Sequence, residues 1–313
     1  MKIIRAFFQL IRWRNLIIVF LTQWFIWQCV IHPMVDWNMG AVFLTPVHFL
    51  LLSFSTLLIA AAGYIINDYF DVKIDVINRP QKVIVDKIIS RRAAILWHSF
   101  FNVTGFLLAI YLARKLDNYY VVLIQLTCTL LLWFYSTHFK RQLLTGNIVV
   151  SILAALTVLV LQVYKPELKG DTKLIMQQQA ISPDWILYGY AFFAFMLTWM
   201  REIVKDMEDV KGDAEQGCKT LPIKMGLEFT AQFVRVLGAF TLLVLGAASI
   251  FVFKLGYIYL GIYTALGVIL PLLWLTFTLG RVNTTTYFAI ASRWLKIIMI
   301  AGICSLIVYH FSK

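Results

Sequence analysis

Charged side chains are scarce in this chain of 313 residues. Asp, Glu, Lys and Arg together make up 14% of it, whereas a soluble domain carries roughly 25% charged residues. Hydrophobic residues make up 61%, and the mean hydropathy is +0.79. This composition excludes an ordinary soluble domain and indicates an integral membrane protein.

Cysteine is also rare, and neither cysteine nor histidine recurs at the spacing of a metal site. The four cysteines are Cys29, Cys128, Cys218 and Cys304. They show no paired or ligand-like pattern, which argues against a disulfide framework or a zinc site. We expect most of them to be ordinary apolar packing residues.

Long apolar runs, by contrast, are abundant. Nine segments come close to the roughly 20 residues that a membrane-spanning helix requires. Their approximate limits are 15–32, 44–67, 92–113, 118–137, 146–164, 184–204, 232–253, 255–279 and 294–311. We therefore predict an all-α, multi-pass membrane protein with nine transmembrane helices in one domain, residues 1–313. The first segment resembles a signal peptide, but no small-residue cleavage site follows it, so we interpret it as a retained helix.

The net charge of +12 reflects orientation in the bilayer. No soluble basic domain is present to bind nucleic acid, so we expect no nucleic-acid partner. When the nine predicted helices alternate in direction, 21 of the 28 Lys and Arg residues fall on the N-terminal side of the membrane. The positive-inside rule then places the N-terminus in the cytoplasm and the C-terminus outside. We expect an integral protein of the cell's inner membrane, in contact with its lipids.

Two stretches, NDYFDVKID and KDMEDVKGD, each carry three aspartates at offsets of three and then four residues. The six aspartates are Asp68, Asp71, Asp75, Asp206, Asp209 and Asp213. These offsets place each trio on one face of a helix, and the predicted topology places both trios on the cytoplasmic face. Carboxylates at the end of an apolar run are costly unless something binds them. The trios therefore predict a divalent-cation site, most simply magnesium serving a diphosphate.

Other polar residues flank the first trio. Asn67 adds an oxygen ligand of the kind magnesium prefers. Arg79 follows Asp75 by four residues, and its planar guanidinium can bond two diphosphate oxygens. Pro80 ends any helix there. The alternative is a solvated helix end with unrelated acids.

The second trio is interspersed with basic residues. Lys205, Lys211 and Lys219 are close enough in sequence to neutralise phosphate oxygens, and Glu202 precedes Asp206 by one turn. The alternative is a basic cluster that binds lipid headgroups. The acids argue against it, because they would repel anionic lipids.

A third polar stretch, YSTHFKRQLLTGN, follows the fourth apolar segment. Its candidates for diphosphate or acceptor contacts are Tyr135, Lys140, Arg141 and Asn147. Arg12, before the first segment, is a further candidate. Basic residues at these positions also fit plain topological anchors, since the positive-inside rule alone would place them there.

Together these motifs resemble the UbiA superfamily of intramembrane prenyltransferases. The residues that carry the resemblance are NDxxDxxxD from Asn67 to Asp75, followed by Arg79 and Pro80, and the second DxxDxxxD. Within that family, KDMEDVKGD followed by GCKTLP is most similar to the digeranylgeranylglyceryl phosphate synthase group. The chain departs from the family in one respect: Trp13 follows Arg12, where the family usually has proline.

The resemblance implies a helical bundle around a central cavity, with cytoplasmic cap segments over the site. It implies that magnesium holds a polyprenyl diphosphate donor and that the prenyl group passes to a lipophilic acceptor. The acceptor expected first is geranylgeranylglyceryl phosphate, in ether-lipid synthesis. Prenylation of a benzoate or naphthoate ring in quinone synthesis, or of a haem or chlorin, stays open.

We predict three overlapping sets of site residues. The metal ligands are Asn67, Asp68, Asp71, Asp206, Asp209 and Asp213. The diphosphate-binding residues are Asn67, Arg79, Lys140, Arg141, Tyr135, Lys211 and Arg12. The catalytic residues are Asp71, Asp75, Asp209 and Asp213, with Asp75 and Asp213 able to bind metal, to hold a basic side chain or to accept the departing proton.

Two rivals from other classes are less consistent with the sequence. Intramembrane acids often mark the path of a transported ion, so a cation or phosphate transporter is one alternative. No acid, however, lies midway through any apolar segment. A non-catalytic membrane scaffold would not need two matched trios.

Overall fold

The computed structural model describes residues 2–34, 45–78, 80–81, 83–162, 182–281 and 284–312. Within these residues the regular secondary structure is helical, apart from one isolated bridge between Val85 and Ile89. The prediction of an all-α membrane protein is confirmed.

The helices follow the predicted apolar segments closely. In chain order they are α1 (Lys2–Leu10), α2 (Trp13–Ile26) with a π-helical turn (Trp27–Ile31), α3 (Pro46–Asn78), α4 (Arg91–Lys115), α5 (Tyr120–Thr137), α6 (Thr145–Leu159), α8 (Pro183–Glu215), α9 (Leu221–Met225), α10 (Leu227–Lys254), α11 (Ile258–Thr264), a π-helical turn (Ala265–Ile269), α12 (Leu270–Thr278) and α13 (Thr285–Phe311). In the described ranges, seven helical segments are long and apolar enough to cross a membrane. The two predicted segments outside that seven are α6, which has 15 residues, and α8, whose apolar part is rich in Trp and Tyr.

Helices α3 and α8 are the longest described, with 33 residues each. The sequence predicted apolar segments that stop before the acidic motifs, at 67 and 204. In the structure both helices continue through the motifs, to Asn78 and Glu215. Neither motif contains a proline, and Pro80 follows the end of α3. Each trio therefore lies on a regular helix, as its spacing requires.

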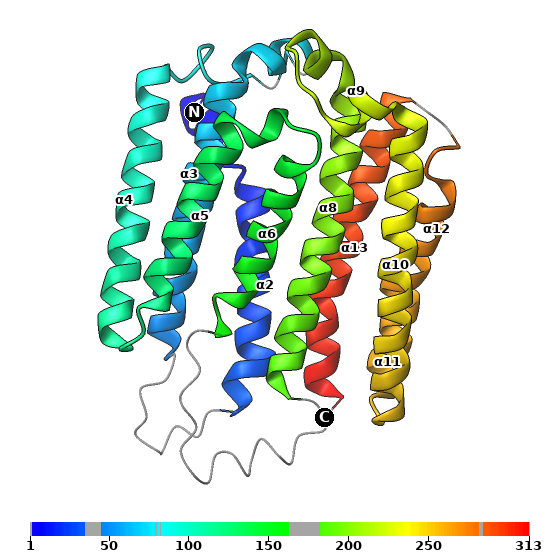
Figure 1. The fold of residues 1–313 in the computed structure, drawn as a ribbon. Helices are drawn as coiled ribbons and strands as arrows, with labels where there is room; N and C mark the ends of the chain where they lie inside the picture. Colours follow the sequence, from blue (N-terminus) through cyan, green and yellow to red (C-terminus); the bar gives the residue numbers. More distant parts are fainter. Residues whose placement is uncertain are drawn as a thin grey trace.

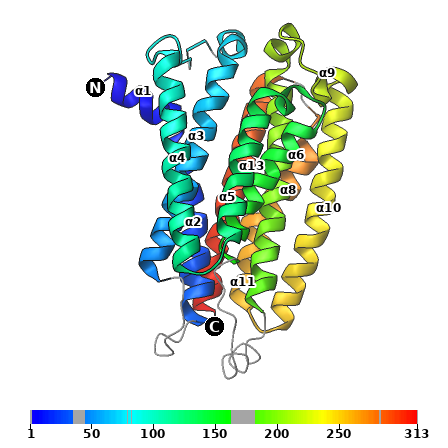
Figure 2. The same ribbon diagram turned by 60° about the vertical axis from the view of Figure 1, so that its left-hand side comes forward.

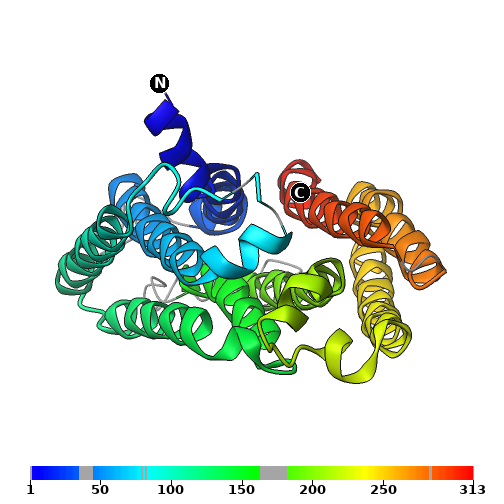
Figure 3. The same cartoon turned by 90° about the horizontal axis from the view of Figure 1, so that it is seen from above.

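The two motif-bearing helix ends lie at the same end of the bundle. In Figure 1 the carboxyl-terminal ends of α3 and α8 are both at the top, with the N-terminus, while the C-terminus is at the bottom. Figure 2 shows the same arrangement after rotation. In Figure 3, which looks down on this end, the two helix ends meet near the middle of the view.

Around this centre, helices pack in neighbouring pairs. Helix α3 contacts α4 and α5, α6 contacts α8, and α8 contacts α13. At one side (Figure 3), α11 and α12 pack against α10 and α13, and α10 also contacts α8. The bundle is thus assembled around α3 and α8, which carry the acidic motifs.

The connection between α3 and α4 is anchored by apolar residues. Ile84, Val85 and Ile89 are buried in one apolar cluster with Ala6 and Leu10 of α1. The other face of α1 exposes apolar side chains, Ile3, Ile4 and Phe8. This pattern is typical of a helix that lies in the membrane interface.

Helices α3 and α4 approach each other closely at Gly105. The Ser55 hydroxyl on α3 donates a hydrogen bond to the Gly105 carbonyl at 2.7 Å. A Cβ at Gly105 would lie 3.0 Å from an Ile59 side-chain carbon and 3.1 Å from the Ser55 carbonyl oxygen. Small residues permit such contacts, which stabilise helix pairs in lipid.

We predict that Gly105→Val destabilises the protein by about 1–3 kcal/mol, because the added methyl groups overpack the α3–α4 contact. Thermal unfolding of the purified protein in detergent is the measurement. Gly246→Val is the matched control, since nothing lies within 4 Å of a Cβ placed there. Equal melting temperatures for the two variants would contradict this view of the interface.

Candidate active site

The side chain of Asn78 links the ends of α3 and α8. Its amide nitrogen donates to the backbone carbonyl of Asp209 at 3.1 Å. Its amide oxygen accepts from the backbone N–H of Gly212 at 2.9 Å. Two hydrogen bonds from one planar amide fix both the distance and the orientation of the second motif relative to the first.

The fit between these helices depends on the absence of a side chain at Gly212. A Cβ built there would lie 2.4 Å from the Asn78 amide oxygen, a distance that real Cβ atoms do not show. Because Gly212 has no side chain, the end of α3 can contact the backbone of the second motif. Asn78 is three residues after Asp75 and seven after Asp71, so it lies on the same helix face as the first trio.

Asp71 is the most buried aspartate of the first trio. It accepts a hydrogen bond from the Asn67 amide at 2.7 Å, and it forms an ion pair with Lys140. Lys140 belongs to a short 3₁₀ turn, Phe139–Arg141, that follows α5. Burial lowers the pKa of this lysine, but its interactions with Asp71, Tyr135 and Asp75 together outweigh burial and raise it. Lys140 is therefore a fixed positive charge in the site.

Arg12 also belongs to the site. It pairs with Asp68 at 2.7 Å, and its guanidinium lies 5.0 Å from the centroid of the Tyr64 ring. Its backbone has φ of 51° at the junction of α1 and α2, an uncommon conformation for a residue with a side chain. Arg12, with Trp13 after it, is thus directed at the first motif.

The second trio faces the same space. Asp206 accepts a hydrogen bond from the Asn147 amide of α6 at 2.8 Å. Asp209 and Asp213 line the same cavity as Asp71 and Asp75. The predicted convergence of the two motifs is therefore what the structure shows.

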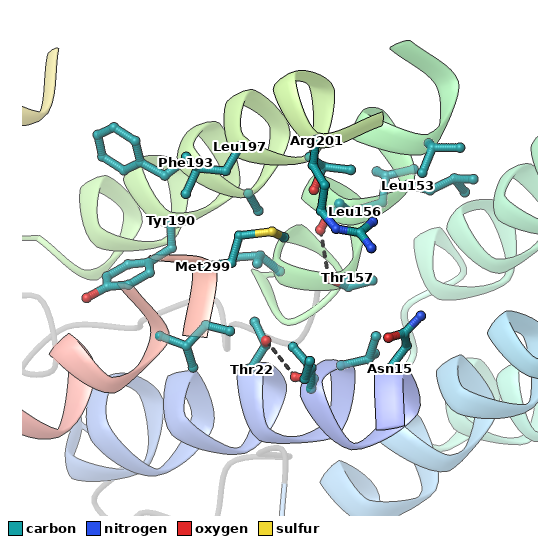
Figure 4. Close-up of a pocket in the computed structure, with 18 of the residues that line it drawn as sticks. Asn15, Thr22, Leu153, Leu156, Thr157, Tyr190, Phe193, Leu197, Arg201 and Met299 are labelled. Carbon is teal, nitrogen blue, oxygen red and sulfur yellow. Dashed lines mark hydrogen bonds between the residues drawn. The ribbon is translucent and has the colours of Figure 1, made fainter. Parts of the chain in front are cut away.

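Both motifs open into a cavity of about 1200 Å³. Its polar end holds the carboxylates with Lys140 and Tyr135, and its body extends between α2, α6, α8 and α13. Figure 4 shows the apolar part of the lining, with Leu156 on α6, Leu197 on α8 and Met299 on α13. This shape suits a ligand with an anionic head and a long hydrocarbon tail.

Some of the predicted site residues line the cavity and others do not. Asn67, Tyr135, Lys140 and Arg12 line the cavity beside the aspartates, whereas Asp68 lies outside its lining but is bound to Arg12. Arg141 and Lys211 are exposed and do not line it. The backbone carbonyl of Arg141 accepts a hydrogen bond from the backbone N–H of Lys219 at 2.8 Å. Arg79 lies outside the described residues.

The donor atoms of the site suit magnesium in kind. The side-chain oxygen of Asn67 is buried and has no hydrogen-bond partner, and it lies on the same helix face as Asp71, whose oxygens are hard ligands. Across the described residues, no three His, Cys, Asp or Glu side chains are already arranged around one metal position. Asp68 and Asp71 instead pair with Arg12 and Lys140, so cationic side chains neutralise these two carboxylates.

Three neighbouring residues were not predicted as site residues. Asn78 could have been found by extending the three-four spacing of the first trio by one more step. Lys296 and Arg201 line the cavity, but a lysine or arginine within or beside an apolar helix gives no indication from sequence of which way it points. Only the packing of α13 against α2 and α8 shows it.

Comparison with known proteins identifies the class. Residues 37–301 match the UbiA prenyltransferase family, so the chain belongs to that family. It is 34% identical over 195 residues to a digeranylgeranylglyceryl phosphate synthase of Methanothermobacter thermautotrophicus, a stretch that spans 62% of this chain and 60% of the relative. It is 31% identical over 234 residues to that of Sulfurisphaera tokodaii, covering 72% of each.

Solved structures share the fold over nearly the whole chain. A structure concerned with digeranylgeranylglyceryl phosphate synthase in membranes has a TM-score of 0.68 at 21% identity, covering 100% of both chains. A UbiA homologue from Archaeoglobus fulgidus, bound to DMAPP and Mg²⁺, has a TM-score of 0.58 at 18% identity, covering 96% of this chain and 99% of the other. At these identities the similarity shows the fold.

We predict that Gly212→Ala lowers prenyl-transfer activity and melting temperature together, because the new methyl group displaces Asn78 and breaks two hydrogen bonds worth about 1 kcal/mol each. Activity assays and thermal unfolding in detergent check this. Gly246→Ala, on a helix surface with open space around it, should leave both values unchanged. A fully active Gly212→Ala protein would show that the Asn78 contact does not position the motifs.

Proposed function

We propose that this protein transfers a polyprenyl group from a polyprenyl diphosphate to a lipophilic acceptor, with magnesium as cofactor. The observation that carries the proposal is the convergence of two aspartate motifs at the polar end of a long apolar cavity. The favoured acceptor is geranylgeranylglyceryl phosphate, because the relatives that align over 62% and 72% of the chain are synthases of the digeranylgeranyl product.

The reaction requires loss of a diphosphate from an allylic carbon. Asn67, Asp68, Asp71, Asp206, Asp209 and Asp213 would hold magnesium, which supplies positive charge to the leaving group when bound. Lys140 and Arg12 lie beside the same carboxylates, and their charges stabilise the oxygens on which negative charge develops. Tyr135 lines the same end of the cavity and can donate its hydroxyl proton in a hydrogen bond to a diphosphate oxygen.

The apolar part of the cavity has two tasks. Leu153, Leu156 and Leu197 line this part (Figure 4) and would surround the hydrocarbon chain and exclude water. Phe193 presents an aromatic ring to the same space and adds to its apolar lining. The acceptor hydroxyl then attacks the carbon, its proton is lost, and an ether bond forms. Asp75 and Asp213, at the polar end, are the candidate proton acceptors.

We further propose that the chain forms one domain with nine membrane-spanning helices, including α6 and α8. Helix α8 starts at the end of the bundle opposite the motifs and finishes beside α3, which parallels it (Figure 1). The basic residues concentrated at the motif end favour a cytoplasmic site. The active site would then open to the compartment in which diphosphates are made and used.

We predict that Asp71→Asn and Asp209→Asn each reduce transfer about a hundredfold or more, because each removes a charge that holds the metal and leaving group. Conversion of labelled geranylgeranyl diphosphate, measured on purified protein in lipid nanodiscs, is the assay. Glu215→Gln, at the exposed end of α8, removes a charge from the same helix without touching the cavity and should retain activity. Normal turnover in Asp71→Asn would refute its assignment.

Removal of divalent cations should abolish activity, and magnesium should restore it. The reason is that uncompensated repulsion between the aspartates and a diphosphate opposes binding. The check is transfer measured after chelation and after stepwise addition of magnesium chloride. Undiminished activity in chelator would exclude the metal-dependent mechanism.

A further inference from the structure

A second group of basic side chains faces the cavity, separate from the aspartate pairs. Lys296 on α13 and Arg201 on α8 both line it. The Lys296 ammonium donates to the Asn15 side-chain oxygen of α2 at 2.7 Å, which draws α13 and α2 together across the cavity wall. Among the described residues, no carboxylate lies within ion-pair distance of Lys296, and both Arg201 and Arg14 repel its charge.

Arg201 is incompletely bonded. One terminal nitrogen donates to Glu202 at 2.7 Å, but its Nε is buried and has no hydrogen-bond partner. Figure 4 shows its guanidinium extending from α8 into the space in front of α2, where Asn15 also points. A buried N–H without a partner is costly, and a ligand oxygen in this space would satisfy it.

The local charges do not balance. Glu202 bonds to both Arg201 and Lys205, the latter at 2.9 Å, so one carboxylate serves two cations. With Lys296 added, Arg201, Lys205, Lys296 and Glu202 carry a formal net charge of +2, which Asp206, near Lys205, partly offsets. The neighbouring Arg12 and Lys140 differ, because each has its own aspartate. A phosphate monoester at neutral pH carries a charge of about −1.5 to −2, which matches this surplus.

We propose that Arg201 and Lys296, with Asn15, form an anion subsite that binds the phosphate monoester of the acceptor lipid. This inference rests on the proposed prenyl transfer. The donor's diphosphate has the aspartate motifs and magnesium as its site. In a glyceryl phosphate the attacking hydroxyl is only one or two carbons from the phosphate, so when that hydroxyl reaches the allylic carbon, the second anion lies close to the first. It needs counter-charges of its own, and this group supplies them within the same cavity.

The subsite sets the acceptor class. A dianionic headgroup accepts a hydrogen bond from the Arg201 Nε–H and also neutralises the surplus positive charge. An alcohol of the same chain length satisfies neither. An aromatic carboxylate supplies half the charge. The protein should therefore select phosphorylated lipid alcohols over neutral ones.

The test is steady-state kinetics with Arg201→Gln and Lys296→Gln in nanodiscs. The acceptor is varied at saturating geranylgeranyl diphosphate, and the donor is then varied at saturating acceptor. The acceptors are geranylgeranylglyceryl phosphate, the same lipid without its phosphate, and 4-hydroxybenzoate. We expect each variant to raise KM for the phosphorylated acceptor about tenfold or more, with the KM for donor changed less than twofold. Lys296→Arg should restore most of the loss, and Lys224→Gln, exposed on α9, should have no effect.

The dephosphorylated acceptor gives an internal check, since the variants should use it no worse than the unmodified protein does. An unchanged KM for the phosphorylated acceptor, or a rise in the KM for donor instead, would overturn the subsite. Transfer to 4-hydroxybenzoate but not to the glyceryl phosphate would overturn it while leaving prenyl transfer intact. Failure of the unmodified protein to transfer to any acceptor would overturn the proposed function as well.

Discussion

The site depends on the contact between the carboxyl-terminal ends of α3 and α8. The Asn78 amide makes two hydrogen bonds to the α8 backbone, and Gly212 allows the approach. Each helix carries three aspartates, and the contact brings all of them except Asp68 to the lining of one cavity. Without it, the trios would be two separate acidic helix ends. The carboxylates at each end would then be unfavourable, because nothing would bind them.

That cost explains the cations found beside the motifs. A buried carboxylate without a partner is strongly unfavourable, and Asp71 is almost fully buried. Lys140 and Arg12 neutralise Asp71 and Asp68 within the protein. In the proposed function, the same two cations lie next to the oxygens of the bound diphosphate. Lys140 and Arg12 thus stabilise the folded site and are already placed to bind an anionic ligand, as expected of a preorganised site.

The sequence predicted the fold class, the helices and the meeting of the two trios, because apolar length and three-four spacing are local properties of the chain. The apolar segments that it predicted stop at 67 and 204, before the acidic motifs, whereas the spacing of the trios placed the motifs on helices, as the structure shows. It also treated Lys140 and Arg141 alike, although the 3₁₀ turn directs Lys140 into the cavity and leaves Arg141 exposed. Lys296 and Arg201 depend on how α13, α8 and α2 pack, which no local pattern encodes.

The most direct test is a structure of the protein with manganese, in place of magnesium, and a non-hydrolysable geranylgeranyl thiodiphosphate. The account predicts metal density between α3 and α8, with oxygen ligands from both Asp71 and Asp209 and with the prenyl chain lying along Leu156 and Leu197. Metal and diphosphate held by one helix alone, or at another place on the molecule, would contradict it.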